Sequence, residues 1–342
     1  MRTFFLIPLI ALYLIILSGC TATKRIETIN SPSILSGDKG GFRSIKYLNK
    51  ISGTQTVSGI HNREPNATPA KWTNEIFKTT GKFPGLWSGD FLFQAENIDN
   101  RKTMVDEALR QWNQGSLVNI MWHACNPALS QPCGWDKNGV LSKLTSQQWT
   151  ELTTDGTQLN KKWKSMMDEV SIHLQFLKDN KVEVMFRPLH EMNQKVFWWG
   201  GRPGPDGTSR LWQITHDYFT KTKGLTNLIW IWDIQDFASL ASDAESYFPG
   251  DQYFDIAALD VYDDKSGFSK EKYDVMVRAS RGKPIAIGEC QKLPTAEKLT
   301  EQPKWTFFMS WSELTYSKNS TADIEALYNA PNVLTLDELD RK

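Results

Sequence analysis

The chain has 342 residues, a length that fits one large α/β domain. Lys plus Arg and Asp plus Glu both total 39, so the formal net charge is zero. A chain with balanced charge does not have the excess of basic residues that is typical of nucleic-acid-binding proteins, so no nucleic-acid partner is predicted. The 14 tryptophans are a high number, and their flat rings suit either apolar ligand faces or core packing.

The first twenty residues have the features of an export signal. Met1-Arg2 is a short basic start, and the apolar run from Phe4 to Leu17 is shorter than the roughly 20 residues that span a bilayer. The run ends in Leu17-Ser18-Gly19-Cys20, which resembles a bacterial lipoprotein cleavage site. This resemblance implies that Cys20 becomes the first mature residue and carries a lipid anchor. The alternative is a cleaved secretory signal with an incidental cysteine.

The expected organisation is a signal peptide (1–19), a polar tether rich in Ser, Thr, Gly and Asn (20–41) and one folded domain (42–342). No second apolar run is long enough to span a bilayer, so we expect an exported protein that its lipid holds on a bacterial membrane. The segment after Cys20 lacks the acidic run that resembles a surface-export signal. Its absence favours the periplasmic face and leaves cell-surface display open.

Cleavage before Cys20 leaves three cysteines. Cys125 and Cys133 lie in an expected loop, and an oxidising compartment would allow them to form a disulfide, although the sequence leaves this pairing open. No histidine lies at ligand spacing from the pair, so a zinc site is not predicted there. No cofactor and no metal are expected.

Beyond residue 42, short apolar runs alternate with longer amphipathic stretches. Continuous apolar runs are typical of parallel strands that are buried on both faces. The predicted strands are Thr56–His61, Phe83–Asp90, Leu117–His123, Val182–His190, Asn227–Asp233, Phe254–Tyr262, Pro284–Glu289 and Thr306–Trp311. The clearest predicted helices are Arg101–Trp112, Trp163–Lys178, Ser209–Lys223 and Lys270–Arg281.

This alternation predicts an α/β fold with a single (β/α)8 barrel. A doubly wound open sheet is the alternative, but the first strand runs into Gly59-Ile60-His61-Asn62, which is not a glycine-rich phosphate-binding turn. The long excursion Ala124–Leu159 follows the third strand and is expected to shape a binding cleft.

Each predicted strand ends in residues that a buried strand would not favour. These ends are His61-Asn62, Trp87 to Asp90, Trp122-His123, His190-Glu191, Trp232-Asp233, Asp260 to Tyr262, Gly288-Glu289 and Trp311 to Glu313. Any one of them has an ordinary explanation as a cap or a turn. In a barrel, however, all eight converge on the rim where the active sites of such enzymes lie.

Two carboxylates dominate this ring, Glu191 after the fourth strand and Glu289 after the seventh. Two glutamates that face each other across a tryptophan-lined cleft suit the hydrolysis of a glycosidic bond, in which one donates a proton and the other stabilises or attacks the sugar carbon. Glu289, after Gly288, is expected to stay ionised, and Glu191, beside aromatic rings, to hold its proton. The alternative for each is an ion pair with a barrel-interior arginine such as Arg187.

Four motifs together resemble glycoside hydrolase family 26. Phe186-Arg187-Pro188-Leu189-His190-Glu191-Met192-Asn193 with Phe197-Trp198-Trp199-Gly200 is similar to the acid/base signature of that family. Ile287-Gly288-Glu289 resembles its nucleophile strand, Trp122 to Pro127 its Trp-His-x-x-Asn-Pro segment, and Leu259 to Tyr262 the end of its sixth strand. The resemblance covers roughly residues 42 to 335.

The resemblance implies a retaining mechanism in a (β/α)8 fold, most often on β-1,4-mannan. Glu191 would be the general acid/base and Glu289 the nucleophile, while Tyr262 would hydrogen-bond near Glu289. His190 and His123 would orient the acid and contact the sugar. The expected aromatic subsites are Trp87, Trp122, Trp198 and Trp311.

One position departs from the family pattern. The family usually places an aromatic residue before the Phe-Trp-Trp-Gly run, and this chain has Val196, preceded by Gln194-Lys195. Trp87 or Trp311 is expected to fill the space of the missing ring.

The leading hypothesis is an endo-acting β-1,4-mannanase, a monomer with mannan or manno-oligosaccharides as its substrate and a membrane as its other partner. An exo-acting mannobiohydrolase, or a member acting on mixed-linkage glucan or β-1,3-xylan, is the alternative within the same class. A lipid-anchored carbohydrate-binding protein without catalysis is the alternative from another class.

Overall fold

The computed structural model describes residues 41–340. The predictions for the signal peptide and for Cys20 lie outside the described residues, as does the tether except Gly41. Within residues 41–340, no helix has both the length and the apolar character needed to cross a membrane.

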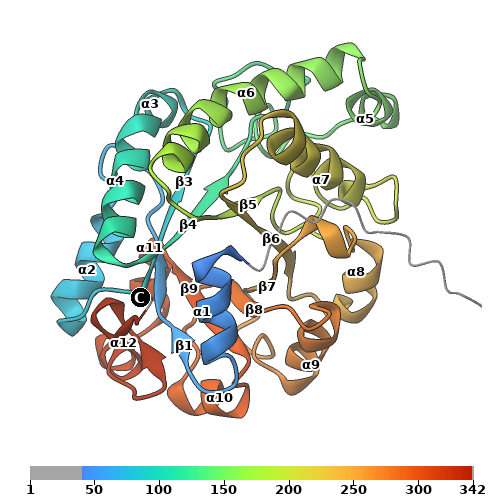
Figure 1. The fold of residues 1–342 in the computed structure, drawn as a ribbon. Coiled ribbons are helices and arrows are strands. Elements are labelled where there is room, and N and C mark those ends of the chain that lie inside the picture. Colours follow the sequence, from blue (N-terminus) through green and yellow to red (C-terminus); the bar gives the residue numbers. More distant parts are fainter. Residues whose placement is uncertain (1–40, 341–342) are drawn as a thin grey trace, which may run out of the picture. The chain divides into compact units, whose positions relative to one another are not determined.

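Strands and helices alternate along the described chain (Figure 1). The strands are β1 (Thr56–Val57), β2 (Gly59–His61), β3 (Leu86–Asp90), β4 (Leu117–Trp122), β5 (Val184–Pro188), β6 (Leu228–Gln235), β7 (Ile256–Val261), β8 (Ile285–Cys290), β9 (Trp305–Trp311) and β10 (Val333–Leu334). The helices are α1 (Arg43–Ile51), α2 (Lys71–Thr80), α3 (Ala95–Asp99), α4 (Arg101–Gln114), α5 (Ser146–Thr153), α6 (Gln158–Asp179), α7 (Thr208–Asp217), α8 (Leu240–Ser246), α9 (Lys270–Ala279), α10 (Ala296–Glu301), α11 (Ser312–Lys318) and α12 (Thr321–Tyr328), with short turns of helix at η2 (Tyr218–Thr222), η3 (Asp251–Tyr253) and η4 (Leu336–Glu338).

The sheet closes on itself. Strands β2 to β8 each pair in parallel with the next strand in the chain, and β9 also pairs in parallel with β2. The predicted (β/α)8 barrel is therefore confirmed, and the open sheet is excluded, because an open sheet leaves two unpaired edges.

Each predicted strand contributes to the barrel, and the sequence missed mainly local interruptions. The first predicted strand is divided into β1 and β2 at Ser58, whose N–H and hydroxyl both donate to the carbonyl oxygen of Leu334. The predicted helix Ser209–Lys223 changes at Tyr218 from the α-helix α7 into the π-helical turn η2.

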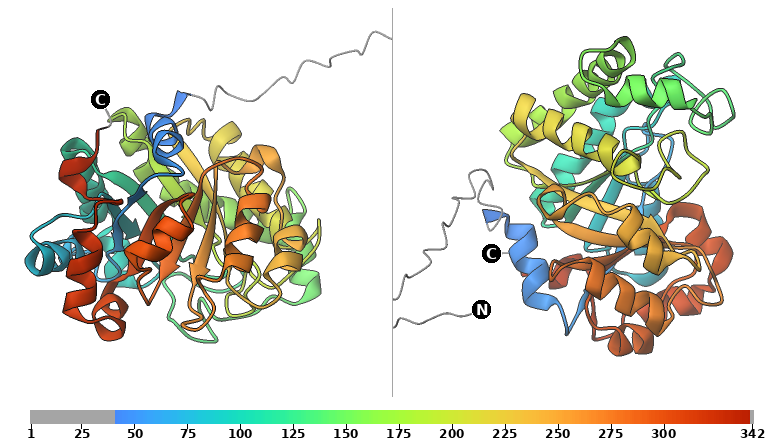
Figure 2. Two further views of the ribbon diagram at one scale, coloured as in Figure 1. Left: turned by 90° about the horizontal axis from the view of Figure 1, so that it is seen from below. Right: turned by 90° about the vertical axis from the view of Figure 1, so that its right-hand side faces the viewer.

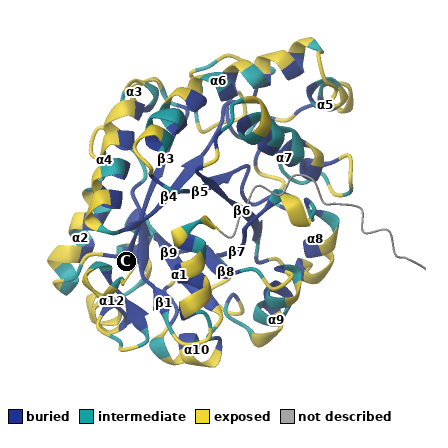
Figure 3. Ribbon diagram, in the orientation of Figure 1, coloured by how far each residue is buried: buried dark blue, intermediate teal, exposed yellow. Residues whose placement is uncertain are grey.

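Burial follows the layers of the barrel. The strands are buried almost throughout, whereas the surrounding helices expose their outer faces, as Figure 3 shows. The two further views in Figure 2 show the helices arranged around the strands. A period of 3.6 residues puts the apolar side chains of each helix on one stripe, which faces the strands. The strands are apolar on both faces, because helices cover one face and the barrel interior encloses the other.

Helix α1 covers the end of the barrel where the strands begin (Figure 1). Its Leu48 and Ile51 pack in one apolar cluster with residues near strand starts, including Leu117 and Met185. The helix is held by Glu183, just before β5, whose carboxylate accepts hydrogen bonds from the N–H groups of Arg43 (2.8 Å) and Ser44 (2.8 Å). The opposite rim, where the strands end, is left for polar side chains.

We expect Glu183→Ala to lower the free energy of unfolding by about 1–2 kcal/mol, because it leaves two helix N-terminal N–H groups without their acceptor. Urea denaturation measures this difference. The matched control is Glu75→Ala, which removes an exposed i,i+3 ion pair with Lys78 and should change stability by less than about 0.5 kcal/mol. Equal effects in the two variants would contradict the proposed anchoring of α1.

Candidate active site

A single buried cation organises the rim. Arg187, the fourth residue of β5, is almost fully buried, and its Nη1 donates to Asp233 Oδ2 (3.0 Å) on β6 and to Asp260 Oδ2 (2.8 Å) on β7. Its Nη2 forms an ion pair with Glu289 Oε1 on β8. Buried charges are tolerated only when they are paired, so these carboxylates and the guanidinium require one another.

Close packing around this ion-pair cluster explains Gly288. A Cβ added at Gly288 would collide with Asp233 Oδ2 and would lie 2.6 Å from Asp260 Oδ1. Glycine is therefore required at this position by space, and it brings Glu289 next to Arg187.

Glu289 is held at both carboxylate oxygens. Oε1 binds Arg187, and Oε2 accepts a hydrogen bond of 2.6 Å from the hydroxyl of Tyr262. His190 Nε2 lies 3.9 Å from Oε1. The alternative ion pair between Glu289 and Arg187 is thus present. Glu289 nevertheless lies on the rim beside Tyr262 and His190, so the ion pair does not exclude a place in the site.

Glu191 has different surroundings. Its backbone adopts a left-handed conformation (φ 49°), as does that of Leu189, and its N–H donates to Asp233 Oδ1 (3.0 Å). Non-glycine residues in this region cost about 1–3 kcal/mol each and are typical of functional sites. The side chain accepts a hydrogen bond from Gln194 Nε2 to Oε2 (2.5 Å). Among the described residues, the ion-pair partners of Arg187 are Asp233, Asp260 and Glu289, and Glu191 is not one of them.

The two glutamates face each other at short range. Carboxylate oxygens of Glu191, Asp260 and Glu289 lie within 4.8 Å of one another. Such a group of three could in principle hold a cation, but Arg187 already binds two of its members. The remaining carboxyl, Glu191, is available for proton transfer.

Their environments separate the two carboxyls electrostatically. Burial raises the pKa of Glu191 well above its usual value, and the nearby charges of Glu289 and Asp233 raise it further. Burial also raises the pKa of Glu289, but the Arg187 cation and the hydrogen bond from Tyr262 act against this rise. Of the pair, Glu191 therefore has the stronger tendency to hold a proton, and Glu289 the stronger tendency to be ionised.

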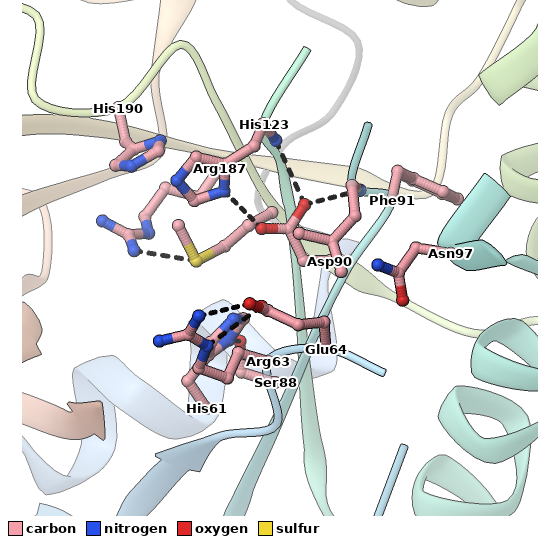
Figure 4. Close-up of polar contacts among 12 residues, drawn as sticks. His61, Arg63, Glu64, Ser88, Asp90, Phe91, Asn97, His123, Arg187 and His190 are labelled. Atoms are coloured by element: carbon pink, nitrogen blue, oxygen red, sulfur yellow. Dashed lines mark hydrogen bonds and ion pairs between the residues drawn. The ribbon is translucent and has the colours of Figure 1, made fainter. Parts of the chain in front are cut away.

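Three histidines line the other half of the rim. His123, after β4, binds Asp90 Oδ2 through Nδ1 and lies with its ring centroid 4.4 Å from that of His190 (Figure 4). Burial lowers the pKa of His190 well below its usual value, with help from His123 and Arg187. Burial likewise lowers the pKa of His61 to about 3. His190 and His61 are therefore neutral hydrogen-bonding groups at ordinary pH.

A cavity of about 300 Å³ opens beside His123. It is lined by side chains that follow β2, β3, β4 and β9, together with Trp135 from the long loop, and its wall includes the ion pair between Arg63 and Glu64 (Figure 4). His61 Nε2 is buried and has no hydrogen-bond partner among the described residues. Trp311 stacks on the same ring at 4.3 Å. A mixture of flat aromatic faces and fixed polar groups suits a sugar.

Three of the predicted aromatic subsites are wrong. Trp87, Trp122 and Trp198 are at most 1% exposed. The indole N–H groups of Trp87 and Trp198 donate to the carbonyl oxygens of Pro69 and Ala124, and Trp122 stacks on Trp163 of α6. Trp87 and Trp122 point outward from their strands into the layer between barrel and helices, because successive strand residues face opposite sides. Trp198 lies in the segment after β5 and packs edge-on against Trp163 of α6. Of the four tryptophans, only Trp311 lines the cavity.

The sequence missed Trp135, which is 53% exposed at the mouth. Cys125 and Cys133 do form the disulfide that the sequence left open, with 5.9 Å between their Cα atoms. This bridge fixes the loop that carries Trp135, whose ring lies 5.7 Å from those of His123 and Phe197. The available signal was the position of Trp135 two residues after Cys133 in a long loop.

We expect the stability difference between Glu191→Gln and the wild type to depend on pH. A raised folded-state pKa means that the proton of Glu191 stabilises the fold below the unfolded pKa of about 4.3, and that this contribution is lost as the pH rises through the folded value. Glutamine has no such proton, so the variant should gain about 1–3 kcal/mol relative to the wild type between pH 5 and pH 8. Thermal unfolding at several pH values measures this; a constant or shrinking difference would contradict it.

Known proteins are similar to this chain in sequence and in structure. A mannan endo-1,4-beta-mannosidase of Thermothelomyces thermophilus is 27% identical over 335 residues, which cover 92% of this chain and 63% of that protein. This chain thus spans less than two thirds of that relative's length. Among solved structures, GH26A from Muricauda sp. MAR_2010_75 is 32% identical, with a TM-score of 0.82 over 87% of this chain and 96% of that one.

A second structure, the GH26-CBM35 beta-(1,4)-mannanase of Podospora anserina, is 27% identical, with a TM-score of 0.72 over 88% of this chain and 67% of that one. Residues 38–338 match the family described as Glycosyl hydrolase family 26. The match spans both glutamates and most of the chain, and it agrees with the family that the four motifs resemble. The chain belongs to glycosyl hydrolase family 26.

Proposed function

We propose that this chain is a retaining glycoside hydrolase that cleaves internal β-1,4-mannosidic bonds of mannans. The observation that carries the proposal is the pair of buried glutamates whose carboxylate oxygens lie within 4.8 Å. Retaining enzymes hold their two carboxyl groups about 5–5.5 Å apart, whereas inverting enzymes need about 6.5–9.5 Å to admit a water. The names of the Thermothelomyces and Podospora relatives support mannan as the substrate class.

In the first step, Glu289 attacks the anomeric carbon while Glu191 gives its proton to the leaving oxygen. Arg187 and Tyr262 hold Glu289 from its two oxygens, so the carboxylate is oriented before the substrate arrives. The bond from the Tyr262 hydroxyl weakens as the charge on Glu289 is used to form the glycosyl ester. In the second step, ionised Glu191 takes a proton from water, and that water releases the sugar.

The surroundings of the carboxyls support endo action. A cavity of about 300 Å³ follows β2, β3, β4 and β9 on one side of the glutamate pair. A second cavity of about 520 Å³ is lined by the segments that follow β5 and β6, including Asn193, two residues after Glu191, and the exposed ring of Phe237. Internal cleavage needs room for sugar units on both sides of the bond that breaks.

We expect Glu289→Ala and Glu191→Ala each to lower the rate of β-mannan hydrolysis about a thousandfold or more, measured by reducing ends. Glu75→Ala, which removes an exposed glutamate from α2, is the matched control and should keep the wild-type rate. Wild-type cleavage by Glu289→Ala would contradict the nucleophile assignment, and binding without turnover by the unmodified protein would favour the non-catalytic alternative. On mannohexaose, early products of mixed length are expected, and mannobiose alone would contradict endo action.

The anchor is a separate proposal. We propose that the protein is exported and held on a bacterial membrane by a lipid on Cys20, with the Leu17-Ser18-Gly19-Cys20 resemblance as the main support. The disulfide between Cys125 and Cys133 adds support, because such bonds persist in oxidising compartments. Cys20 itself lies outside the described residues, so the support comes from the sequence and from this bond.

We expect Cys20→Ala to abolish the incorporation of labelled fatty acid in a bacterial host and to move the protein from the membrane fraction to the soluble fraction. The label on the wild-type protein, and its persistence after sodium dodecyl sulfate extraction, are the reference. Labelling of Cys20→Ala, or no labelling of the wild type, would contradict the anchor. Protease treatment of intact cells then distinguishes the periplasmic face from the cell surface.

A further inference from the structure

We propose that Gln194 is a positioning residue, which directs the proton of Glu191 onto the carboxyl oxygen that faces the substrate. The inference rests on the proposed function, in which Glu191 is the general acid/base. Gln194 is the first residue of the Gln194-Lys195-Val196 segment, where the chain departs from the pattern of its family. The departure from the family pattern therefore includes a residue that contacts the proposed acid, Glu191.

The contacts of the Gln194 amide are specific. Its Nε2 donates to Glu191 Oε2 at 2.5 Å and to the side-chain oxygen of Gln235 at the end of β6. An amide nitrogen carries two hydrogens, so the two contacts use both. Within residues 41–340, no donor is hydrogen-bonded to the other carboxyl oxygen of Glu191, Oε1.

The turn that carries Gln194 is fixed to the barrel independently of this contact. The backbone N–H of Gln194 donates to the carbonyl oxygen of Glu191 (2.8 Å). Asn193 binds the backbone of Gln235 in both directions, accepting from its N–H (2.7 Å) and donating to its carbonyl oxygen (2.9 Å). Asn193 also donates to Asp243 (2.8 Å). The amide of Gln194 is thus held in place before any substrate binds.

Hydrogen-bond chemistry assigns the proton. A protonated carboxyl has one O–H and one oxygen that only accepts, and Gln194 Nε2 can only donate. Oε2 must therefore be the accepting oxygen, and the proton resides on Oε1. When Oε1 passes this proton to the leaving glycosidic oxygen, the bond between that oxygen and the anomeric carbon breaks and Glu289 forms the new bond. Glu191 becomes a carboxylate, and its bond from Gln194 becomes charge-assisted and stronger.

The test compares two substrates in the variant Gln194→Met, which keeps the length of the side chain and removes the donor. Cleavage of mannopentaose needs the acid, because its leaving group is a sugar alkoxide. Cleavage of 2,4-dinitrophenyl β-mannobioside does not, because dinitrophenolate leaves without a proton. We expect kcat/KM on mannopentaose to fall about 10- to 100-fold and kcat/KM on the dinitrophenyl substrate to fall less than about threefold.

A second readout is the pH profile. Loss of a donor to the carboxylate raises the pKa of Glu191, so the alkaline limb of kcat/KM on mannopentaose should move to higher pH by about one unit. The ratio of the two substrate rates does not depend on how much of the variant is folded. Glu75→Ala, on α2 and outside both cavities, is the control and should change neither the ratio nor the limb. Gln235→Leu should shift both in the direction of Gln194→Met by a smaller amount.

Equal losses of kcat/KM on both substrates with an unmoved alkaline limb would overturn the role of Gln194, as would the same change of ratio in Glu75→Ala. Glu191→Ala separates this result from a failure of the proposed function. If Glu191→Ala loses mannopentaose cleavage and keeps formation of dinitrophenolate, the acid is correctly assigned and the result for Gln194 stands alone. If Glu191→Ala affects both substrates equally, the assignment of the acid is itself wrong.

Discussion

The rim of this barrel depends on one buried guanidinium. Arg187 contacts three carboxyl groups from three consecutive strands, β6, β7 and β8, in a buried environment that disfavours ionised carboxylates. Burial raises the pKa of Asp233 and raises that of Asp260 well above its usual value, and in both cases Arg187 is the main opposing influence. Each strand end is therefore placed by an electrostatic requirement as well as by the sheet.

The same cation makes the two glutamates unlike. Glu289 is one of its ion-pair partners, whereas Glu191 is attached to the cluster through its backbone N–H, which donates to Asp233. The left-handed backbone at Glu191 accompanies this attachment, and such strained positions are typical of functional sites. The two glutamates thus differ because, among the contacts of the described residues, the cluster binds the side chain of Glu289 but only the backbone of Glu191.

The sequence predicted what strands determine and failed where loops and side-chain direction decide. The apolar runs located every barrel strand, because strands enclosed on both faces must be apolar throughout. The glutamate pair could be found because strand order alone brings the carboxyl ends together. Trp87 and Trp122 were misplaced because a strand residue faces either the barrel axis or the helices, and a run that is apolar throughout does not reveal which. Trp135 was missed because its position depends on how the loop between β4 and α5 folds back.

The segment Gln194-Lys195-Val196, where the chain departs from the family pattern, links the loops to the glutamates that the strands position. Val196 is 41% exposed and leaves no ring before Phe197, while the disulfide-bonded loop supplies Trp135, whose ring lies 5.7 Å from that of Phe197. An aromatic wall next to His123 is thus assembled from a different segment. In the same stretch, Gln194 adds a donor to the acid. The strands and Arg187 hold the two glutamates of the rim, and the loops determine both the wall of the cleft and the hydrogen bonding of Glu191. Under the proposed function, substitutions in this short segment are expected to alter substrate fit and acid strength together, since one turn carries both Gln194 and Val196.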